Sequence, residues 1–126
     1  MLNQYGFEGT QWNLAKRQGR DILIAVARRR GQIAYSEFVA QITALRMEPH
    51  DFRLFHFLGE ISTEEDGAGR GMLTAIVVHK NGDMQPGPGF FELAESLGRN
   101  TKDTLACWVK EFNYVHDYWA SRDGRA

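Results

Sequence analysis

The strongest hydrophobic pattern in the chain is the nearly continuous apolar run of residues 72–78, which is rich in β-branched side chains. A run of this length and composition is typical of a strand that is buried on both faces. Asn81 and Gly82 follow the run, and this dipeptide favours a tight turn because both residues tolerate positive φ. The pattern therefore predicts a small antiparallel hairpin at the centre of the fold.

Helical periodicity dominates the N-terminal part of the chain. Apolar residues recur at helical spacing over residues 10–30, which predicts a first helix with Thr10 as its N-cap. Gly19 lies inside this helix, where glycine costs about 1 kcal/mol relative to alanine, so we expect close packing or a kink there. Residues 32–35 predict a short strand, and Ser36 is the expected N-cap of a second helix.

Three further helices are predicted in the remainder of the chain. Asp51 is the expected N-cap of a third helix, which we expect to end in the polar, glycine-rich loop of residues 64–71. Its expected inward positions are Phe52, Leu54, Phe55, Leu58 and Ile61. The Pro-Gly-Pro-Gly segment at 86–89 precedes a helix over 90–97, and the last helix covers 102–121. The expected inward positions of that last helix are Leu105, Trp108, Val109, Phe112, Val115, His116 and Trp119.

The order of these elements is helix, short strand, helix, helix, strand, turn and short strand, which is the order of a winged-helix domain. We therefore predict a single α+β domain over residues 1–126, winged-helix-like, with a small antiparallel hairpin and extra C-terminal helices. Residues 1–9 are expected to be a loose lead-in and residues 122–126 a frayed tail. A three-stranded α+β domain of another topology is the main rival, because sequence does not reveal strand pairing.

Composition narrows the classes of function. The formal net charge of −1 supplies no global positive field that would draw the chain to nucleic acid or to an acidic membrane. A lone cysteine, Cys107, excludes an intramolecular disulfide and fits a reducing compartment. We see neither the pattern of a signal peptide nor an apolar run near the roughly 20 residues that span a bilayer, so we expect a cytoplasmic protein.

Two resemblances bear on the fold. The segment at 31–42, GQIAYSEFVAQI, followed by a helix, by a strand ending in two valines and by a turn, resembles the winged-helix domain of the alkyltransferase-like DNA-repair proteins. In that family the strand carries a Pro-Cys-His-Arg motif, which residues 73–78 lack, so the nucleophile chemistry does not carry over. Residues 12–119 look more like a family of small bacterial proteins of unassigned function. The segments that carry this second resemblance are 35–37, 58–61, 72–78, 88–91 and 118–119.

No constellation of residues predicts a reaction, a metal site or a cofactor. His56 and Glu60 are an i, i+4 pair on one helix face, but two ligands without a partner motif are a weak metal signal. Cys107 and His116 are about two and a half helical turns apart, too far for direct contact along one helix. The 86–89 segment lacks the Gly-Lys-Ser/Thr of a phosphate-binding loop. We therefore expect no catalytic residue, no metal and no cofactor.

Exposed aromatic and acidic residues favour a module that binds another protein. Tyr114 and Tyr118 form an i, i+4 pair beside the inward stripe of the last helix, and partly exposed aromatics are enriched in interfaces. Glu60, Glu64 and Glu65 make the third helix acidic, which suits a basic partner of the kind that an inhibitor, immunity protein or adaptor receives. These five residues are the predicted partner-binding surface.

Two alternative functions remain open. A winged-helix DNA-binding protein would use cations, of which the candidates are Arg28, Arg29, Arg30, Arg53 and Lys80. The acidic side chains of the third helix oppose this interpretation, because they would face phosphates. A small hydrolase-like enzyme would need His56, Glu60 and His79 to gather in one pocket.

Overall fold

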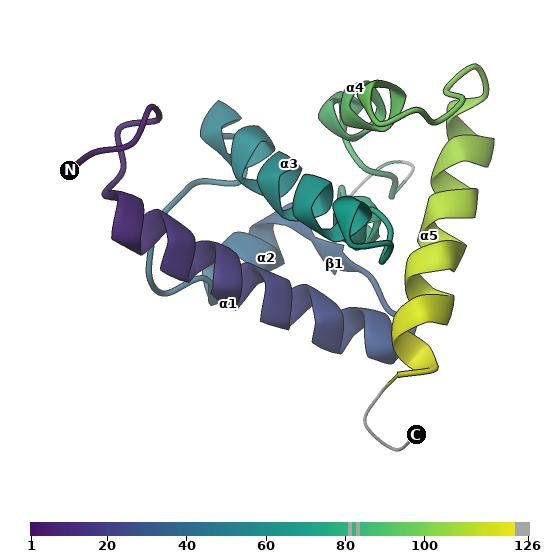
Figure 1. Cartoon of the computed structure of the whole chain (residues 1–126), viewed down its shortest axis with the longest axis horizontal. Helices are drawn as coiled ribbons and strands as arrows, with labels where there is room; N and C mark the ends of the chain where they lie inside the picture. The colour runs from purple at the N-terminus through teal and green to yellow at the C-terminus, as the bar shows by residue number, and fades with distance from the viewer. Residues whose placement is uncertain (81, 83, 123–126) are drawn as a thin grey trace.

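The computed structural model describes residues 1–80, 82 and 84–122, and this part of the chain is mostly helical with a small sheet, an α+β arrangement. The elements are α1 (Gly9–Arg28), β1 (Ile33–Ala34), α2 (Tyr35–Gln41), α3 (Phe52–Gly67), the 3-10 helix η1 (Leu73–Ile76), β2 (Val77–Val78), α4 (Pro88–Ser96) and α5 (Thr104–Ala120). In Figure 1, α1 and α3 lie side by side, α5 crosses the C-terminal end of α1, and α4 lies near the upper end of α5.

The apolar run at 72–78 is buried, as the sequence predicts, but most of it is not a strand. A 3-10 helix has three residues per turn, so residues three apart lie on the same face. Leu73 and Ile76 accordingly join the main core, whereas Met72 and Ala75 join a smaller cluster on the opposite side. Because η1 packs against α1, α3 and α5, the segment is buried between two clusters and supplies apolar side chains to both.

The two strands pair in parallel, so the predicted antiparallel hairpin is wrong. Ile33 pairs with Val77 and Ala34 with Val78. Parallel pairing requires a long crossover between the strands, and α2, α3 and η1 provide it. After β2 the chain folds back only far enough for the backbone N–H of His79 to donate to the carbonyl of Gln85, at 2.9 Å. Asn81 and Asp83, the flanks of the predicted turn glycine, lie outside the described residues.

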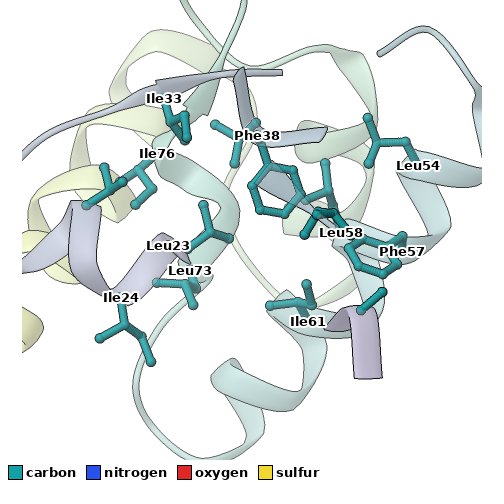
Figure 2. Packing of buried hydrophobic residues seen from close by; sticks show 14 of the residues in the cluster. Leu23, Ile24, Ile33, Phe38, Leu54, Phe57, Leu58, Ile61, Leu73 and Ile76 are labelled. Atoms are coloured by element: carbon teal, nitrogen blue, oxygen red, sulfur yellow. The ribbon is translucent and has the colours of Figure 1, made fainter. Parts of the chain in front are cut away.

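The main core lies between α1, α2, α3 and η1 (Figure 2). Gly19 of α1 lies where a Cβ atom would be 3.0 Å from the ring of Phe38 and 3.3 Å from Ile61, which confirms the expected close packing. The smaller cluster connects η1 to α4 and α5. Its members are Met72, Ala75, Phe90, Ala94 and Cys107.

Helix boundaries depart from the predicted ones where a different group caps the backbone. Glu8, not Thr10, is the N-cap of α1, because its carboxylate accepts from the Thr10 N–H at 3.2 Å. Helix α2 begins at Tyr35, one residue before the predicted cap Ser36, and the Glu37 side chain accepts from the Ala34 N–H. Asp51 caps α3 as predicted, but that helix continues to Gly67 and covers the first half of the 64–71 segment expected to be a loop.

The N-terminal segment folds onto α1 rather than extending away from it. Leu2 and Glu8 form an antiparallel bridge, and Asn3 accepts from two backbone N–H groups of the same loop. The rings of Tyr5 and Phe7 stack against Trp12, with centroids 5.0 and 5.5 Å away. None of the helices in the described residues combines the length and the apolar character needed to span a lipid bilayer.

Candidate functional site

A cavity of about 220 Å³ lies between α3 and α4. Leu54, Phe55 and Leu58 form its α3 side, and Phe90 and Leu93 form its α4 side. Helices α3 and α4 approach closely at Gly89, which also lines the cavity, because a Cβ atom there would lie 2.3 Å from the ring of Phe55. Only a glycine allows this approach without displacing the ring, so the geometry of the cavity depends on it.

Two aromatic side chains at the edge of this cavity are exposed. Phe52 is 73% exposed and Phe55 is 41% exposed, although the helical period predicts that both face inward. Both rings lie beside His56, with centroid distances of 6.1 and 5.1 Å. We call Phe52 and Phe55 the aromatic rim. An exposed aromatic pair beside an apolar cavity is a feature that binding surfaces share.

A second hollow of about 340 Å³ adjoins the cavity, because Tyr35, Pro49 and His50 line both of them. We call this second hollow the polar mouth. Ser36, His79 and Lys80 complete its described lining. The mouth therefore brings one lysine, two imidazoles and two hydroxyl groups beside an apolar cavity.

Tyr35 and Gly87 connect the polar mouth to the start of α4. The Tyr35 hydroxyl accepts from the Gly87 N–H at 2.9 Å. A Cβ atom on Gly87 would lie 3.3 Å from Nε2 of His79 and 3.6 Å from the Tyr35 hydroxyl, so these groups are close neighbours. Burial raises the pKa of Tyr35 above its ordinary value of 10.0, and the side chain stays a neutral phenol at physiological pH.

The carboxylate of Asp51, which lines the cavity, forms an ion pair with an adjacent guanidinium. Arg53 donates to it through Nε at 3.0 Å and through Nη2 at 2.7 Å. These hydrogen bonds from Arg53 lower the pKa of Asp51 below 3.8, and Asp51 therefore stays charged and paired. Arg53 also lies 4.2 Å above the ring of Phe7 and donates to the Tyr5 carbonyl.

The predicted acidic surface on α3 is largely occupied by internal partners. Glu60 accepts from Trp12 Nε1 at 2.9 Å and pairs with Lys16 at 3.0 Å. Glu64 also pairs with Lys16, at 2.9 Å. Glu65 is 1% exposed and is bound by two guanidinium groups, those of Arg20 and Arg70. Of the three glutamates, Glu64 alone has a largely exposed side chain.

The two tyrosines of the predicted partner surface have different environments. Tyr114 is 50% exposed, but its hydroxyl donates to the Gly69 carbonyl at 2.8 Å and its ring covers Gly71. Tyr118 is partly buried against the main core, and the guanidinium of Arg122 lies 3.9 Å over its ring. Tyr114 therefore helps to hold the 68–71 loop, and replacing it alters the fold locally as well as the surface.

Four of the five candidate DNA-binding cations have partners within the chain. Arg28 lies 5.8 Å over the ring of Trp119, Arg29 donates to the Ala25 carbonyl, and Arg30 pairs with Asp117 at 2.9 Å. Arg53 is engaged by Asp51, as described above. Lys80 is exposed, and it lies in the polar mouth, away from these arginines along the chain.

The residues proposed for a hydrolase-like site have separate partners. His56 stacks on Tyr5 at 4.9 Å, and Glu60 is held by Trp12 and Lys16, whereas His79 lines the polar mouth. Among the described residues, no group of three or more histidine, cysteine or acidic side chains is arranged to hold a metal ion.

The cysteine and histidine of α5 are also apart. Cys107 is buried in the smaller cluster, and burial raises its thiol pKa above the ordinary value of 9.0, which disfavours the reactive thiolate. His116 is buried elsewhere on the helix, where its Nε2 lies 2.8 Å from the Gly31 carbonyl.

The sequence pattern placed the aromatic rim in the core and therefore missed the cavity. One available signal was the width of the apolar pattern on α3, where positions 52, 54, 55, 57 and 58 are all apolar and exceed a single stripe. A helix with apolar residues over so much of its circumference either is buried all round or exposes some of them. His79 and Lys80 were noted separately, but their proximity to His50 depends on the tertiary fold.

Comparison of the chain with protein-family models, with curated proteins and with solved structures finds no match. Any proposal about function therefore has to be argued from the residues of this chain and their contacts. The apolar cavity, its aromatic rim and its polar mouth are the features that those contacts bring together.

Proposed function

We propose that the protein is a non-catalytic module that binds a protein partner, and that an apolar side chain of the partner enters the cavity between α3 and α4. The observation that carries this proposal is the exposure of Phe52 and Phe55 at the edge of an apolar cavity. Exposing two aromatic rings to water is unfavourable, and binding energy in protein interfaces is concentrated where aromatics surround a desolvated pocket.

This proposal keeps the predicted class of function but places the binding site at the cavity between α3 and α4 instead of on the predicted acidic and tyrosine surface. An inhibitor, immunity protein or adaptor with an acidic face would need free carboxylates, but Glu60 and Glu65 are already bound to cations of the same chain. Breaking such pairs to receive a basic partner would leave a buried charge without its counter-ion, which is costly. The aromatic rim has no such cost, because its rings are exposed already.

The surroundings of Cys107 and His116 support a non-catalytic role, and those of Cys107 also support a location inside the cell. A nucleophile or general base needs a neighbour that activates it, whereas Cys107 lies among apolar residues and His116 is bound to a backbone carbonyl. The buried free thiol of Cys107 is consistent with a reducing compartment such as the cytoplasm.

The winged-helix interpretation, and DNA binding with it, has weaker support. Its wing would require an antiparallel hairpin, whereas the described strands pair in parallel. Its cations would have to exchange present partners, such as Asp117 and Asp51, for phosphates. A labelled duplex titrated at low and moderate salt tests this alternative, because phosphate binding weakens steeply with added salt.

A selection from a random peptide library displayed on phage tests the proposal. The bait is the wild-type protein, and the selected peptides are then measured against Phe52→Ser and against Leu105→Ser. Both substitutions replace an exposed apolar residue on a helix by serine, since Leu105 is 51% exposed on α5, and so they have similar effects on solubility and fold.

We expect the selected peptides to share an apolar residue, to lose at least about tenfold in affinity for Phe52→Ser and to bind Leu105→Ser as they bind the wild type. Loss of binding to Leu105→Ser alone would move the interface to α5. A selection that enriches nothing, or peptides that ignore Phe52→Ser, would overturn the proposal.

A further inference from the structure

We infer that the site receives the C-terminal residue of its partner, with the apolar side chain of that residue in the cavity and its α-carboxylate in the polar mouth. The inference rests on the proposed function and adds the chemistry of the segment that binds. It follows from the continuity of the two hollows, which share Tyr35, Pro49 and His50 and differ sharply in character.

The size of the cavity suits one side chain. Its volume of about 220 Å³ is below the roughly 300–1,000 Å³ of pockets that hold drug-sized ligands. An aromatic or aliphatic side chain fits such a space, and the exposed aromatic rim would cover the backbone next to it. A partner helix would need a long groove for its apolar face, and a cavity of this volume is too small for one.

The charge of the polar mouth suits an anion. Lys80 is exposed there, and His50 and His79 add ring N–H donors beside the hydroxyls of Ser36 and Tyr35. The described lining of the mouth contains no carboxylate, and Asp51 of the adjoining cavity is already bound by Arg53. A carboxylate in the mouth would therefore gain charge-assisted hydrogen bonds without displacing an existing pair.

The start of α4 adds to this preference. Gly87 is the N-cap of α4, Gly89 lies in its first turn, and both line the cavity. The N-terminal end of a helix carries partial positive charge, which favours an anion nearby.

Three small probes separate the apolar and the charged contributions: N-acetyl-phenylalanine, its C-terminal amide and N-acetylglycine. Binding is followed by amide chemical shifts of the ¹⁵N-labelled protein. We expect the acid and the amide of phenylalanine to shift signals of residues that line the cavity, among them Gly59 and Leu93. We expect the acid to bind about tenfold more tightly than the amide. N-acetylglycine should bind more weakly than either phenylalanine probe.

Two variants assign the contributions to residues. Lys80→Gln should reduce the affinity for the acid toward that of the amide and leave the amide unchanged. Gly59→Leu should prevent binding of both phenylalanine probes, because a side chain at this position projects toward the cavity. A Cβ atom on Gly59 would lie 3.9 Å from Leu93, so Gly59→Ala fits without a clash and is the matched control for the fold.

A peptide that ends in phenylalanine is then compared with the same peptide extended beyond that residue. Tighter binding of the peptide that ends in phenylalanine supports capture of a chain end.

Equal binding of the two peptides, or of the acid and the amide, overturns the inference and leaves the apolar docking of the proposed function standing. Binding of N-acetyl-phenylalanine together with failure of both peptides overturns it as well and points to a small amphiphilic acid as the ligand. Absence of cavity shifts with all three probes overturns it too, and the peptide selection then tests the proposed function separately.

Discussion

Asp51 has three roles at the start of α3. Its carboxylate accepts from the backbone N–H of Arg53 at 2.9 Å, which caps the helix, and it binds the side chain of the same arginine. Asp51 is also the one carboxylate in the described lining of the cavity, and the pairing compensates its charge. A single residue therefore stabilises the helix that carries the aromatic rim, and its pairing with Arg53 weakens the repulsion that its charge would exert on an anion nearby.

The charge of Asp51 makes part of the stability depend on pH. Asparagine is an equally good N-cap, so Asp51→Asn retains the cap and removes the ion pair. At pH 7 we expect the variant to be less stable by roughly 0.5–1 kcal/mol, the size of a partly exposed ion pair. The folded-state pKa of Asp51 is lowered, so its contribution is present above the ordinary aspartate pKa and is lost as the pH falls through the folded value.

Urea unfolding of the wild type and Asp51→Asn over the range from neutral to acidic pH measures this contribution. The difference in unfolding free energy should shrink to near zero in acid. A difference that stays constant with pH would show that the ion pair does not contribute and that the substitution acts on the cap.

At the scale of elements, the 68–72 loop is held by polar contacts from two helices. Arg70 binds Glu65 of α3, Gly69 accepts from Tyr114 of α5, and the Met72 N–H donates to Glu111 of α5 at 2.9 Å. Glu111 is in turn bound by Arg99, which follows α4 and also binds Asp66. The glycine-rich composition predicts a polar loop, and these contacts attach its 68–72 part to the rest of the fold.

Substitutions at two glycines of this loop distinguish the cost of backbone strain from the cost of a steric clash. Gly69 and Gly71 both have positive φ, of 79° and 85°. A Cβ atom on Gly69 would meet nothing within 4 Å, whereas one on Gly71 would lie 2.6 Å from the ring of Tyr114. We expect Gly69→Ala to cost about 1 kcal/mol, from backbone strain alone, and Gly71→Ala to cost about 2–4 kcal/mol.

Denaturant unfolding of both variants, in the wild type and in a Tyr114→Ala background, tests this explanation. Removing the ring should make the two glycine substitutions nearly equal in cost. If Gly71→Ala remains much more costly without Tyr114, contact with that ring is not the cause.

At the scale of the whole molecule, the two apolar clusters share one short segment. Leu73 and Ile76 pack into the main core, and Met72 and Ala75 pack into the cluster beneath α4 and α5. The buried pair of Ser62 and Thr74 hydroxyls, 2.5 Å apart, attaches the same segment to α3. Because η1 supplies side chains to both clusters, disruption of either cluster is transmitted to the other.

This coupling predicts a single cooperative unfolding transition. Leu23→Ala in the main core and Met72→Ala in the smaller cluster should each cost about 2–5 kcal/mol, because both side chains are fully buried. For each variant, the unfolding midpoint should be the same whether unfolding is followed by circular dichroism or by tryptophan fluorescence. Separate transitions in Met72→Ala would show that the smaller cluster, and with it the cavity wall on α4, unfolds independently.

Three features of the fold could be read from the pattern of residues along the chain. Asp51 caps α3 because a carboxylate can reach the free N–H groups of its own helix, whatever the rest of the fold does. Gly19 and the apolar run at 72–78 indicated close packing and burial, and both are present. The cap was predictable because its partners are neighbours in the chain, and the burial because so apolar a run is buried in any compact fold. Gly19 indicated close packing because a glycine inside a helix is otherwise unfavourable, although the residues that pack on it are distant in sequence.

The tertiary structure alone decided the pairing of the strands and the composition of the candidate site. The side chains of Phe52 and Phe55 are exposed, whereas those of Glu65 and Glu111 are buried. Two guanidiniums compensate the desolvation of Glu65. One guanidinium and a backbone N–H compensate that of Glu111. A helical period shows that an apolar face exists, but its width and its counter-charges depend on residues distant in sequence. The parallel pairing of Ile33 with Val77 and the meeting of His50 with His79 and Lys80 depend in the same way on how separate segments pack.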